Sequence, residues 1–269
     1  MRDKVTTAAE AMAEVQDGAL VAFNFWGPGT PLHLMRALQE RGVKDLTICT
    51  NNYTLRADIL REQGAVDAAI LLPQTRKIIV AFSGVQQEDS SASVEIARRV
   101  QEGTLEIENV SHGLFIERIQ AGAMHLGGIY SPIGIGTSLE VGKEKRVING
   151  VEYIFQEPIV PDLGLVNAAK ADKFGNLVCH GTARAANPII AMAARYTIAE
   201  VFEVVEPGEL DPDAIVVPAA FVDRIVCIPD DDPHSRERRI EQTLHSVKYR
   251  LQKMAEAEAE AEAARGGKS

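Results

Sequence analysis

Three polar segments of the sequence carry the residue types best suited to binding a small ligand. The first follows an apolar run and precedes a stretch with helical spacing, and it reads Asn24-Phe25-Trp26-Gly27-Pro28-Gly29. Backbone N–H groups in such a loop can contact an anion or a carbonyl oxygen, and glycines let the ligand approach closely. The loop matches neither GxGxxG nor a Walker loop. Taken alone, it is equally compatible with a plain connector.

The second segment is a pair of amides, Asn51 and Asn52, at the end of another apolar run. Two adjacent amides offer paired hydrogen-bond donors, and they would lie beside the first loop if the two runs form neighbouring strands. That edge is where an α/β sheet places its ligand. Capping of a helix or a turn is the alternative role for these residues.

The third segment contains His112 and Gly113, where a strand is expected to give way to a helix. A histidine there could orient a carboxylate or act as an acid or base near neutral pH, although a structural role is the alternative. Gly134 and Gly136 mark a second glycine-bearing loop. They read first as turn residues, and a binding role for them needs independent support.

The sequence contains no self-sufficient catalytic set. It lacks the GxSxG and HExxH patterns, and its three cysteines, Cys49, Cys179 and Cys227, lie far apart. An odd number of scattered cysteines predicts neither a disulfide framework nor a metal site, and it fits a reducing cytoplasm.

Charge and hydropathy exclude further classes of protein. A net charge of −10 argues against a partner with a phosphate backbone, so we expect no binding to nucleic acid. There is no run of 18 apolar residues, and the first residues lack the apolar core of a signal peptide. We therefore expect a cytoplasmic protein that neither spans a membrane nor is exported.

The order of apolar and amphipathic segments predicts an α/β fold with an open, mainly parallel sheet and flanking helices. A strand at 19–23, a helix at 32–41 and a strand at 45–50 form a βαβ unit. The further expected strands are 77–82, 163–168, 196–205 and 223–228, and the further helices are 5–16, 93–102, 114–121 and 188–194. Asn149-Gly150 predicts a hairpin within 147–155.

The composition changes after residue 228. We expect one domain over 1–228, a charged helix over 229–253, and an Ala/Glu-rich tail over 254–269 that is frayed or disordered.

In chain order, these segments resemble the motifs of the alpha subunit of family I coenzyme A transferases of the 3-oxoacid type. Asp17-Gly18-Ala19 and Gly27-x-Gly29-x-Pro31 are similar to its opening signature, with Phe23 and Asn24 where the usual pattern has paired glycines. The later matches are Asp45–Thr47, Asn51-Asn52, Gly113–Gly122, Tyr130–Thr137, Gly142–Glu144, Ala171-Asp172, Gly175-Asn176, Thr182–Arg184, Asn187-Pro188, Gly208–Pro212 and Val222–Val226. Because the matches run in order from Lys4 to Cys227, the chain is identified as a member of this family.

The resemblance implies an open α/β fold of the type shared with sugar-phosphate isomerases, and a homologous beta subunit in a heterotetramer. In such enzymes a glutamate of the beta subunit, within a Ser-Glu-Asn-Gly-like motif, attacks the acyl-CoA thioester in a ping-pong reaction. This chain has no such motif, so we expect no catalytic residue here and activity only with the partner. CoA would be a substrate, exchanged between an acyl-CoA and a carboxylic acid, and no cofactor would be permanently bound.

The resemblance also assigns the binding residues. The loop from Asn24 to Gly29 would meet CoA or the acyl carbonyl, and Asn51 with Asn52 would supply oxyanion or carboxylate contacts. We add His112, Gly113, Gly134 and Gly136 to these predicted contacts. His112 stands where the family usually has glutamine, so the resemblance does not identify the carboxylic acid substrate.

Three alternatives stand beside this interpretation. A hydrolase of CoA esters, or a ring-cleaving hydrolase, could use the same two-subunit scaffold. A ligand-sensing module is the second, although no basic helix-turn-helix precedes residue 17. In the third, the chain is a structural component whose loops merely complete the partner's pocket.

Overall fold

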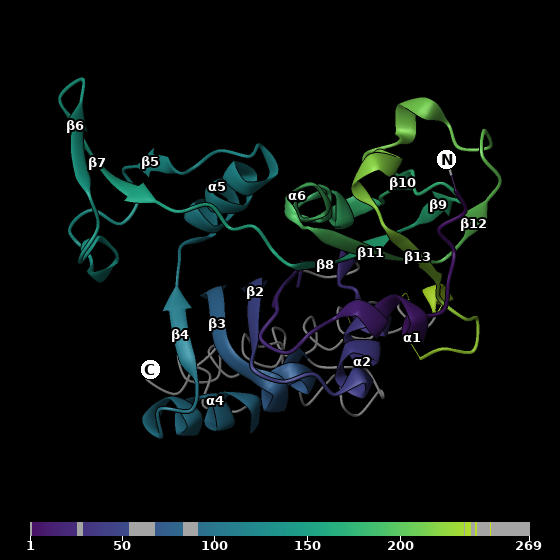
Figure 1. Ribbon diagram of the computed structural model, residues 1–269, viewed down its shortest axis with the longest axis horizontal. Helices are drawn as coiled ribbons and strands as arrows, with labels where there is room; N and C mark the ends of the chain where they lie inside the picture. The colour runs from purple at the N-terminus through teal and green to yellow at the C-terminus, as the bar shows by residue number, and fades with distance from the viewer. Residues whose placement is uncertain are drawn as a thin grey trace, which may run out of the picture.

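A seven-stranded sheet forms the centre of the computed structural model (Figure 1). The structure describes residues 2–25, 29–53, 68–82, 91–233, 235–237, 240 and 248. The strands, in spatial order, are β13 (Arg224–Cys227), β11 (Tyr196–Val201), β8 (Leu163–Ala168), β1 (Leu20–Phe23), β2 (Leu46–Asn52), β3 (Thr75–Phe82) and β4 (Glu106–Asn109). All neighbouring strands in this sheet are parallel, which confirms the predicted fold class.

Helices cover both faces of the sheet (Figure 1). One face packs against α1 (Ala8–Ala11), α2 (Leu32–Arg41) and α4 (Ser91–Gln101), and the other against α5 (His112–Ala123) and α6 (Asn187–Ala193). Short 3-10 turns complete the described helices: η1 (Met12–Glu14), η3 (Ala68–Gln74), η4 (Ser138–Glu140), η5 (Gly181–Arg184), η6 (Pro212–Ala214) and η7 (Ala219–Phe221).

The side chains of β1 show why a parallel strand reads as a continuous apolar run. Val21 and Phe23 belong to the core on the α2 side, whereas Ala22 belongs to the core on the α5 and α6 side. Successive side chains of a strand point to opposite faces, so a strand covered on both faces can be apolar at consecutive positions.

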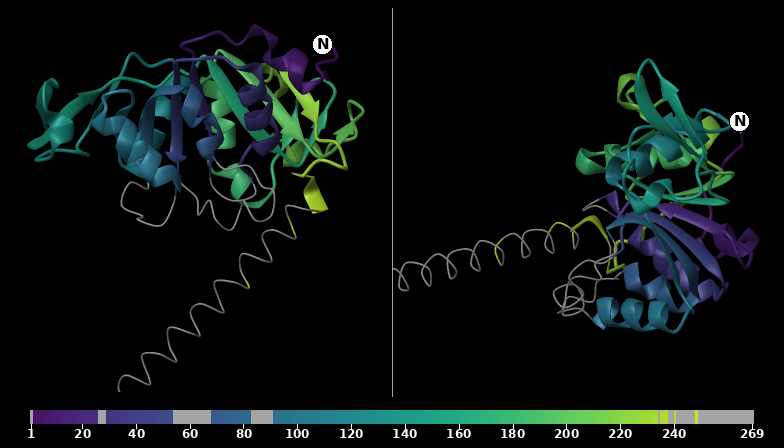
Figure 2. Two further views of the ribbon diagram at one scale, coloured as in Figure 1. Left: turned by 90° about the horizontal axis from the view of Figure 1, so that it is seen from below. Right: turned by 90° about the vertical axis from the view of Figure 1, so that its left-hand side faces the viewer.

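Two small sheets flank the large one. One contains β10 (Leu177–Val178), β9 (Lys170–Asp172) and β12 (Val204–Val205), and the other contains β5 (Ile129–Ser131), β7 (Val151–Gln156) and β6 (Lys145–Ile148). The second sheet projects beyond α5 at one end of the molecule (Figures 1 and 2). Its β6-β7 hairpin turns at Asn149 (φ 52°) and Gly150 (φ 79°), as predicted.

Two predicted elements were too long. The expected helix at 5–16 is only α1 followed by a 3-10 turn, because Val5 forms a parallel bridge to Ile225 and Thr7 begins the helix with a capping box. The expected strand at 196–205 divides, because β11 ends at Val201 and Val204 pairs with Ala171 of the small sheet.

The segment after β13 returns to α2. The Asp232 carboxylate lies 2.8 Å from His33 Nδ1 and 3.5 Å from Arg36 Nη1. Of the predicted helix at 229–253, only residues 229–233, 235–237, 240 and 248 are described, and the predicted tail at 254–269 lies outside the described residues. The division into one domain, helix and tail therefore stays a prediction. Among the described residues, no helix has the length and apolar character needed to cross a membrane.

Candidate functional site

The ends of β1 and β2 meet at the carboxyl edge of the sheet. Ala22 pairs with Cys49, so the same register continued by two residues places Asn24 beside Asn51. The Phe25 N–H donates to Asn51 Oδ1 at 2.8 Å, and Asn51 Nδ2 donates to the Phe25 carbonyl at 3.5 Å. The structure thus brings together the start of the first predicted segment and the first asparagine of the second.

These contacts give Asn51 a definite local task. Its side chain is buried, and both of its polar atoms bind the backbone of Phe25. Asn51 therefore fixes the backbone where β1 leads into the loop. Asn52, the last residue of β2, is half-buried beside Phe82 of β3.

The same edge concentrates unpaired polar atoms. Within the described part of the chain, four buried side-chain atoms have no hydrogen-bond partner: Asn24 Nδ2, Thr50 Oγ1, Gln74 Oε1 and Gln156 Nε2. The first two lie where β1 and β2 end. Because folded proteins satisfy nearly all buried polar groups, unpaired atoms at a sheet edge mark a place for a ligand.

Gly29, the last residue of the first predicted segment, is held from the other side. Asn187, the first residue of α6, is fully buried, and its Nδ2 donates to the carbonyl of Gly29 at 3.0 Å and of Ala183 at 3.1 Å. A Cβ on Gly29 would lie 2.6 Å from Ala183 Cα. This approach requires a residue without a side chain.

We expect Gly29→Ala to lower the free energy of unfolding by about 1–3 kcal/mol, because the added methyl must displace the backbone at Ala183. Gly127→Ala is the matched control, since a Cβ at Gly127 meets nothing within 4 Å. Urea unfolding of both variants checks the prediction. Equal stability of the two variants would contradict the close packing at Gly29.

Sequence reasoning missed a buried carboxylate that also fixes this edge. Glu200 in β11 is fully buried; its Oε2 accepts the Leu34 N–H in the first turn of α2 at 2.9 Å, and its Oε1 accepts Asn167 Nδ2 at 2.9 Å. A negative charge at a helix N-terminus is favourable. A glutamate within an otherwise apolar strand was the signal that could have revealed it. The Leu34 N–H therefore already has an acceptor within the protein.

The third predicted segment begins α5. Ser111 Oγ caps this helix by accepting the Leu114 N–H at 3.1 Å, and His112 and Gly113 are its exposed first residues. A Cβ on Gly113 would lie 3.2 Å from Ile133 Cδ1, so the following loop packs against the start of α5.

Two predicted binding glycines have turn conformations. Gly134 has φ 97° and Gly136 has φ 76°, and the Gly136 N–H donates to Glu140 Oε2 at 2.8 Å. The positive φ angles account for glycine at both positions through the shape of the turn. Trp26, Gly27 and Pro28 lie outside the described residues.

Two titratable groups near this edge, Cys49 and Glu108, are not placed as nucleophiles. Burial raises the pKa of the Cys49 thiol to about 12, so it stays protonated at neutral pH. Burial would raise the pKa of Glu108, but hydrogen bonds from Arg118 and Lys77 outweigh it and hold this pKa below its ordinary value. Glu108 is thus an ionised carboxylate held by two cations.

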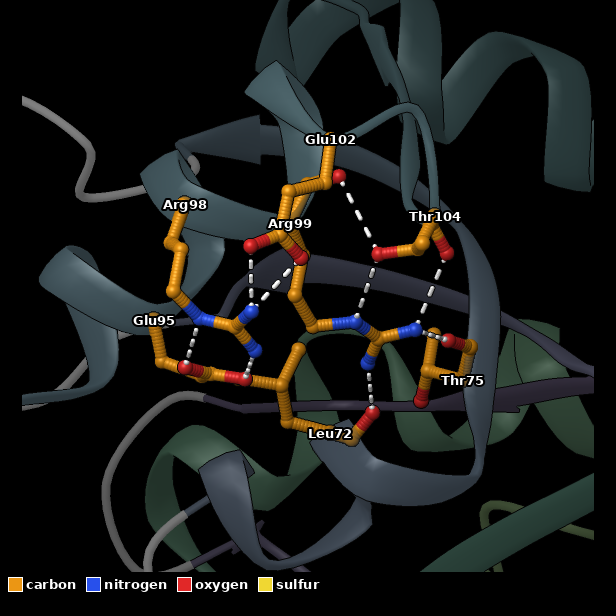
Figure 3. Close-up of polar contacts among 7 residues, drawn as sticks. All are labelled: Leu72, Thr75, Glu95, Arg98, Arg99, Glu102 and Thr104. Carbon is orange, nitrogen blue, oxygen red and sulfur yellow. Dashed lines mark hydrogen bonds and ion pairs between the residues drawn. The ribbon is translucent and has the colours of Figure 1, made fainter.

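A shallow cavity of about 250 Å³ lies at the opposite, amino-terminal edge of the sheet, with Lys44, Thr75 and Arg99 in its wall. The Arg99 guanidinium donates to the backbone carbonyls of Leu72, Thr75 and Thr104 (Figure 3). These carbonyls already accept the N–H groups of the guanidinium, so Arg99 has a structural role in the wall of the cavity. The carboxyl edge is the stronger candidate site.

Comparison with known proteins decides the family. Residues 5–227 match the family model described as "Coenzyme A transferase". The chain belongs to the coenzyme A transferase family. Among curated proteins, this CoA-transferase chain is 41% identical over 233 residues to one subunit of the 3-oxoadipate CoA-transferase of Acinetobacter baylyi, covering 84% of this chain and 95% of the relative.

Other relatives of this CoA-transferase chain are also single subunits. It is 36% identical over 227 residues to the alpha subunit of the acetate CoA-transferase of Escherichia coli, covering 84% and 97% of the two chains. It is 35% identical over 239 residues to one subunit of a probable succinyl-CoA:3-ketoacid coenzyme A transferase of Bacillus subtilis, covering 88% and 95%.

Solved structures share the fold. An acyl-CoA transferase of Escherichia coli O157:H7, crystallised as a thioester complex with CoA, superposes with a TM-score of 0.72 at 22% identity, covering 86% of this chain and 48% of that one. Glutaconate coenzyme A-transferase of Acidaminococcus fermentans has a TM-score of 0.67 at 19% identity, with coverage of 84% and 76%. These likenesses confirm the fold of the CoA-transferase chain.

Proposed function

We propose that this chain is the alpha subunit of a cytoplasmic, heterotetrameric CoA-transferase whose nucleophilic glutamate lies in a homologous beta subunit. The observation that carries the proposal is the character of the carboxyl edge. It holds the buried, unpaired Asn24 Nδ2 donor beside the hydrogen-bonded pair of Asn51 and Phe25. The described carboxylates around it, Glu108 and Glu200, are occupied by cations or donors. Such a site can bind and polarise a substrate but needs a nucleophile from elsewhere.

The chemistry is a double displacement. The partner's glutamate attacks the thioester carbonyl and expels CoA thiolate, which leaves an acyl-glutamyl anhydride. The thiolate then attacks the glutamyl carbonyl, releases the first acid and forms an enzyme-CoA thioester. The second acid repeats these steps in reverse and leaves as its CoA ester. CoA is thus a substrate in this scheme.

This chain would contribute binding and electrostatic stabilisation. Negative charge develops on the carbonyl oxygen during each attack, and donors already aimed at that oxygen lower the barrier. We assign this role to the edge formed by the Asn24–Gly29 loop, Asn51 and Asn52. We also place His112, Gly113, Gly134 and Gly136 within reach of CoA or the acid in the assembled enzyme.

The names of the relatives indicate the class of acid. The curated relatives are named for 3-oxoadipate, acetate, and succinyl-CoA with a 3-ketoacid. Each is a small carboxylic acid or its CoA ester, and we propose the same class of substrate here.

The test is acyl exchange between labelled carboxylic acids and a panel of acyl-CoA esters. We expect exchange only when the chain is co-expressed with its beta subunit, together with a CoA-sized mass increase on the beta subunit. Exchange by the isolated chain would contradict the proposal. Release of CoA without any acceptor acid would identify a hydrolase instead.

A further inference from the structure

Asn24 carries a buried hydrogen-bond donor that no described residue satisfies. The residue is 2% exposed, and its Nδ2 has no hydrogen-bond partner within the described part of the chain. A buried donor without an acceptor is costly, so a native site that keeps one calls for an explanation.

The position of Asn24 shows where this donor points. Phe23 and Phe25 both belong to the core on the α2 side, whereas Ala22 belongs to the core on the α5 side. Side chains alternate along an extended chain, so Asn24 lies on the same face as Ala22 and immediately after the last paired residue of β1. It therefore lies on the face of the sheet that α5 covers. This helix follows β4 in the chain and starts with His112 and Gly113.

Apolar side chains form much of this face below Asn24. Ala22 shares its core cluster with Cys49 of β2, Val166 of β8, and Leu114 of α5. The nearest amide, Asn51, already binds the backbone of Phe25 through both polar atoms. Since no described residue accepts from Asn24 Nδ2, an oxygen of a bound ligand is the acceptor that we assign to it.

We propose that Asn24 is a specificity-determining residue, whose Nδ2 donates to an oxygen that the acyl chain carries beyond its thioester carbonyl. The inference rests on the proposed function. The thioester carbonyl is common to all substrates, whereas the acyl group differs from one acid to the next. A side-chain donor that selects between acids must therefore act on the acyl group. The acceptor oxygen is a chain carbonyl or a second carboxylate.

The test compares three four-carbon acids in the reconstituted two-subunit enzyme: butanoate, 3-oxobutanoate and butanedioate. They match in chain length and differ in the oxygen beyond C1. We expect the wild type to favour one oxygen-bearing acid over butanoate by about tenfold or more in kcat/KM, since a site built for a hydrogen bond rejects the analogue that lacks it. The favoured acid identifies the acceptor as a carbonyl or a carboxylate.

Two substitutions remove the donor in different ways. Asn24→Gly deletes the side chain, and Asn24→Leu replaces it with an apolar one of similar size. Both should lower kcat/KM for the favoured acid by about tenfold more than for butanoate, because the hydrogen bond to the acyl chain is lost for that acid alone. Asn149→Gly, the same change at an exposed position of the β6-β7 turn, is the control and should keep the preference.

An equal loss of kcat/KM for all three acids would overturn the inference, because Asn24 would then act on the shared thioester or on folding. A wild type without any preference would also overturn it. If the wild-type complex transfers CoA to no acid, the proposed function fails, and the role of Asn24 is decided by calorimetric dissociation constants for the same acids. A preference in binding that Asn24→Leu removes supports the role, and identical affinities for all three acids refute it.

Discussion

Replacing Asn51 by alanine is expected to lower kcat/KM of the two-subunit enzyme by about tenfold to a thousandfold, the range found when an oxyanion-site group is deleted. The structure supplies the physical reason. Asn51 Oδ1 accepts the buried Phe25 N–H at 2.8 Å, and the alanine variant leaves that N–H without its acceptor where β1 enters the loop. Steady-state kinetics with saturating beta subunit is the measurement, and Asn149→Gly again serves as the control.

Asn51→Asp separates two ways in which this residue could act. Aspartate keeps an oxygen that accepts the Phe25 N–H but loses the amide donor. If Asn51 mainly anchors the loop, the aspartate variant should retain more activity than the alanine variant. If its Nδ2 also donates to the substrate oxyanion, both variants should lose activity to a similar degree. Nearly full activity in Asn51→Ala would support the alternative in which this chain is only a structural component.

Glu200→Gln is expected to lower the free energy of unfolding by about 1–3 kcal/mol, the range for leaving a buried hydrogen-bonding group unsatisfied. Two groups that contact Glu200, the Leu34 N–H and Asn167 Nδ2, are both donors. A carboxylate accepts from both, whereas glutamine has only one acceptor oxygen and must turn its NH₂ toward one of them. Urea unfolding of the purified protein measures the change.

Glu203→Gln is the matched control for this prediction. Glu203 follows β11 and forms an ion pair with Lys170, and both side chains are nearly half exposed, at 46% and 45%. Exposed pairs of this kind contribute little, so we expect a change of less than about 0.5 kcal/mol. If Glu200→Gln is no less stable than Glu203→Gln, the carboxylate is not needed as a double acceptor.

The parts of the fold that were predicted correctly are those set by short-range chemistry. Helix α2 ends where Gly42 adopts φ 75°, and the hairpin turns at Asn149-Gly150. Strand β8 was predicted with its observed bounds because it is a mainly apolar run that is buried on both faces. Each of these signals is contained within a few neighbouring residues.

The site was predicted only as far as strand adjacency allows. A βαβ unit places β1 beside β2, and this arrangement brought Asn51 to the first loop. The contacts that fix the loop from the other side join residues far apart in sequence: 158 positions separate Asn187 from Gly29, and 166 separate Glu200 from Leu34. Such pairs depend on which strand lies on the second side of β1, and the local pattern does not encode that choice.

The strand order has a consequence for synthesis of the chain. β1 lies at the middle of the sheet, with β2 on one side and β8 on the other, and Val21 pairs with Leu163. At translation rates of about 5–20 residues per second, β8 is made roughly 7–30 seconds after β1. During that interval one edge of an apolar strand has no partner, and an unpaired strand edge is prone to intermolecular pairing. The late synthesis of β8 thus sets the period in which β1 lacks its second neighbour and the nascent chain is prone to aggregation.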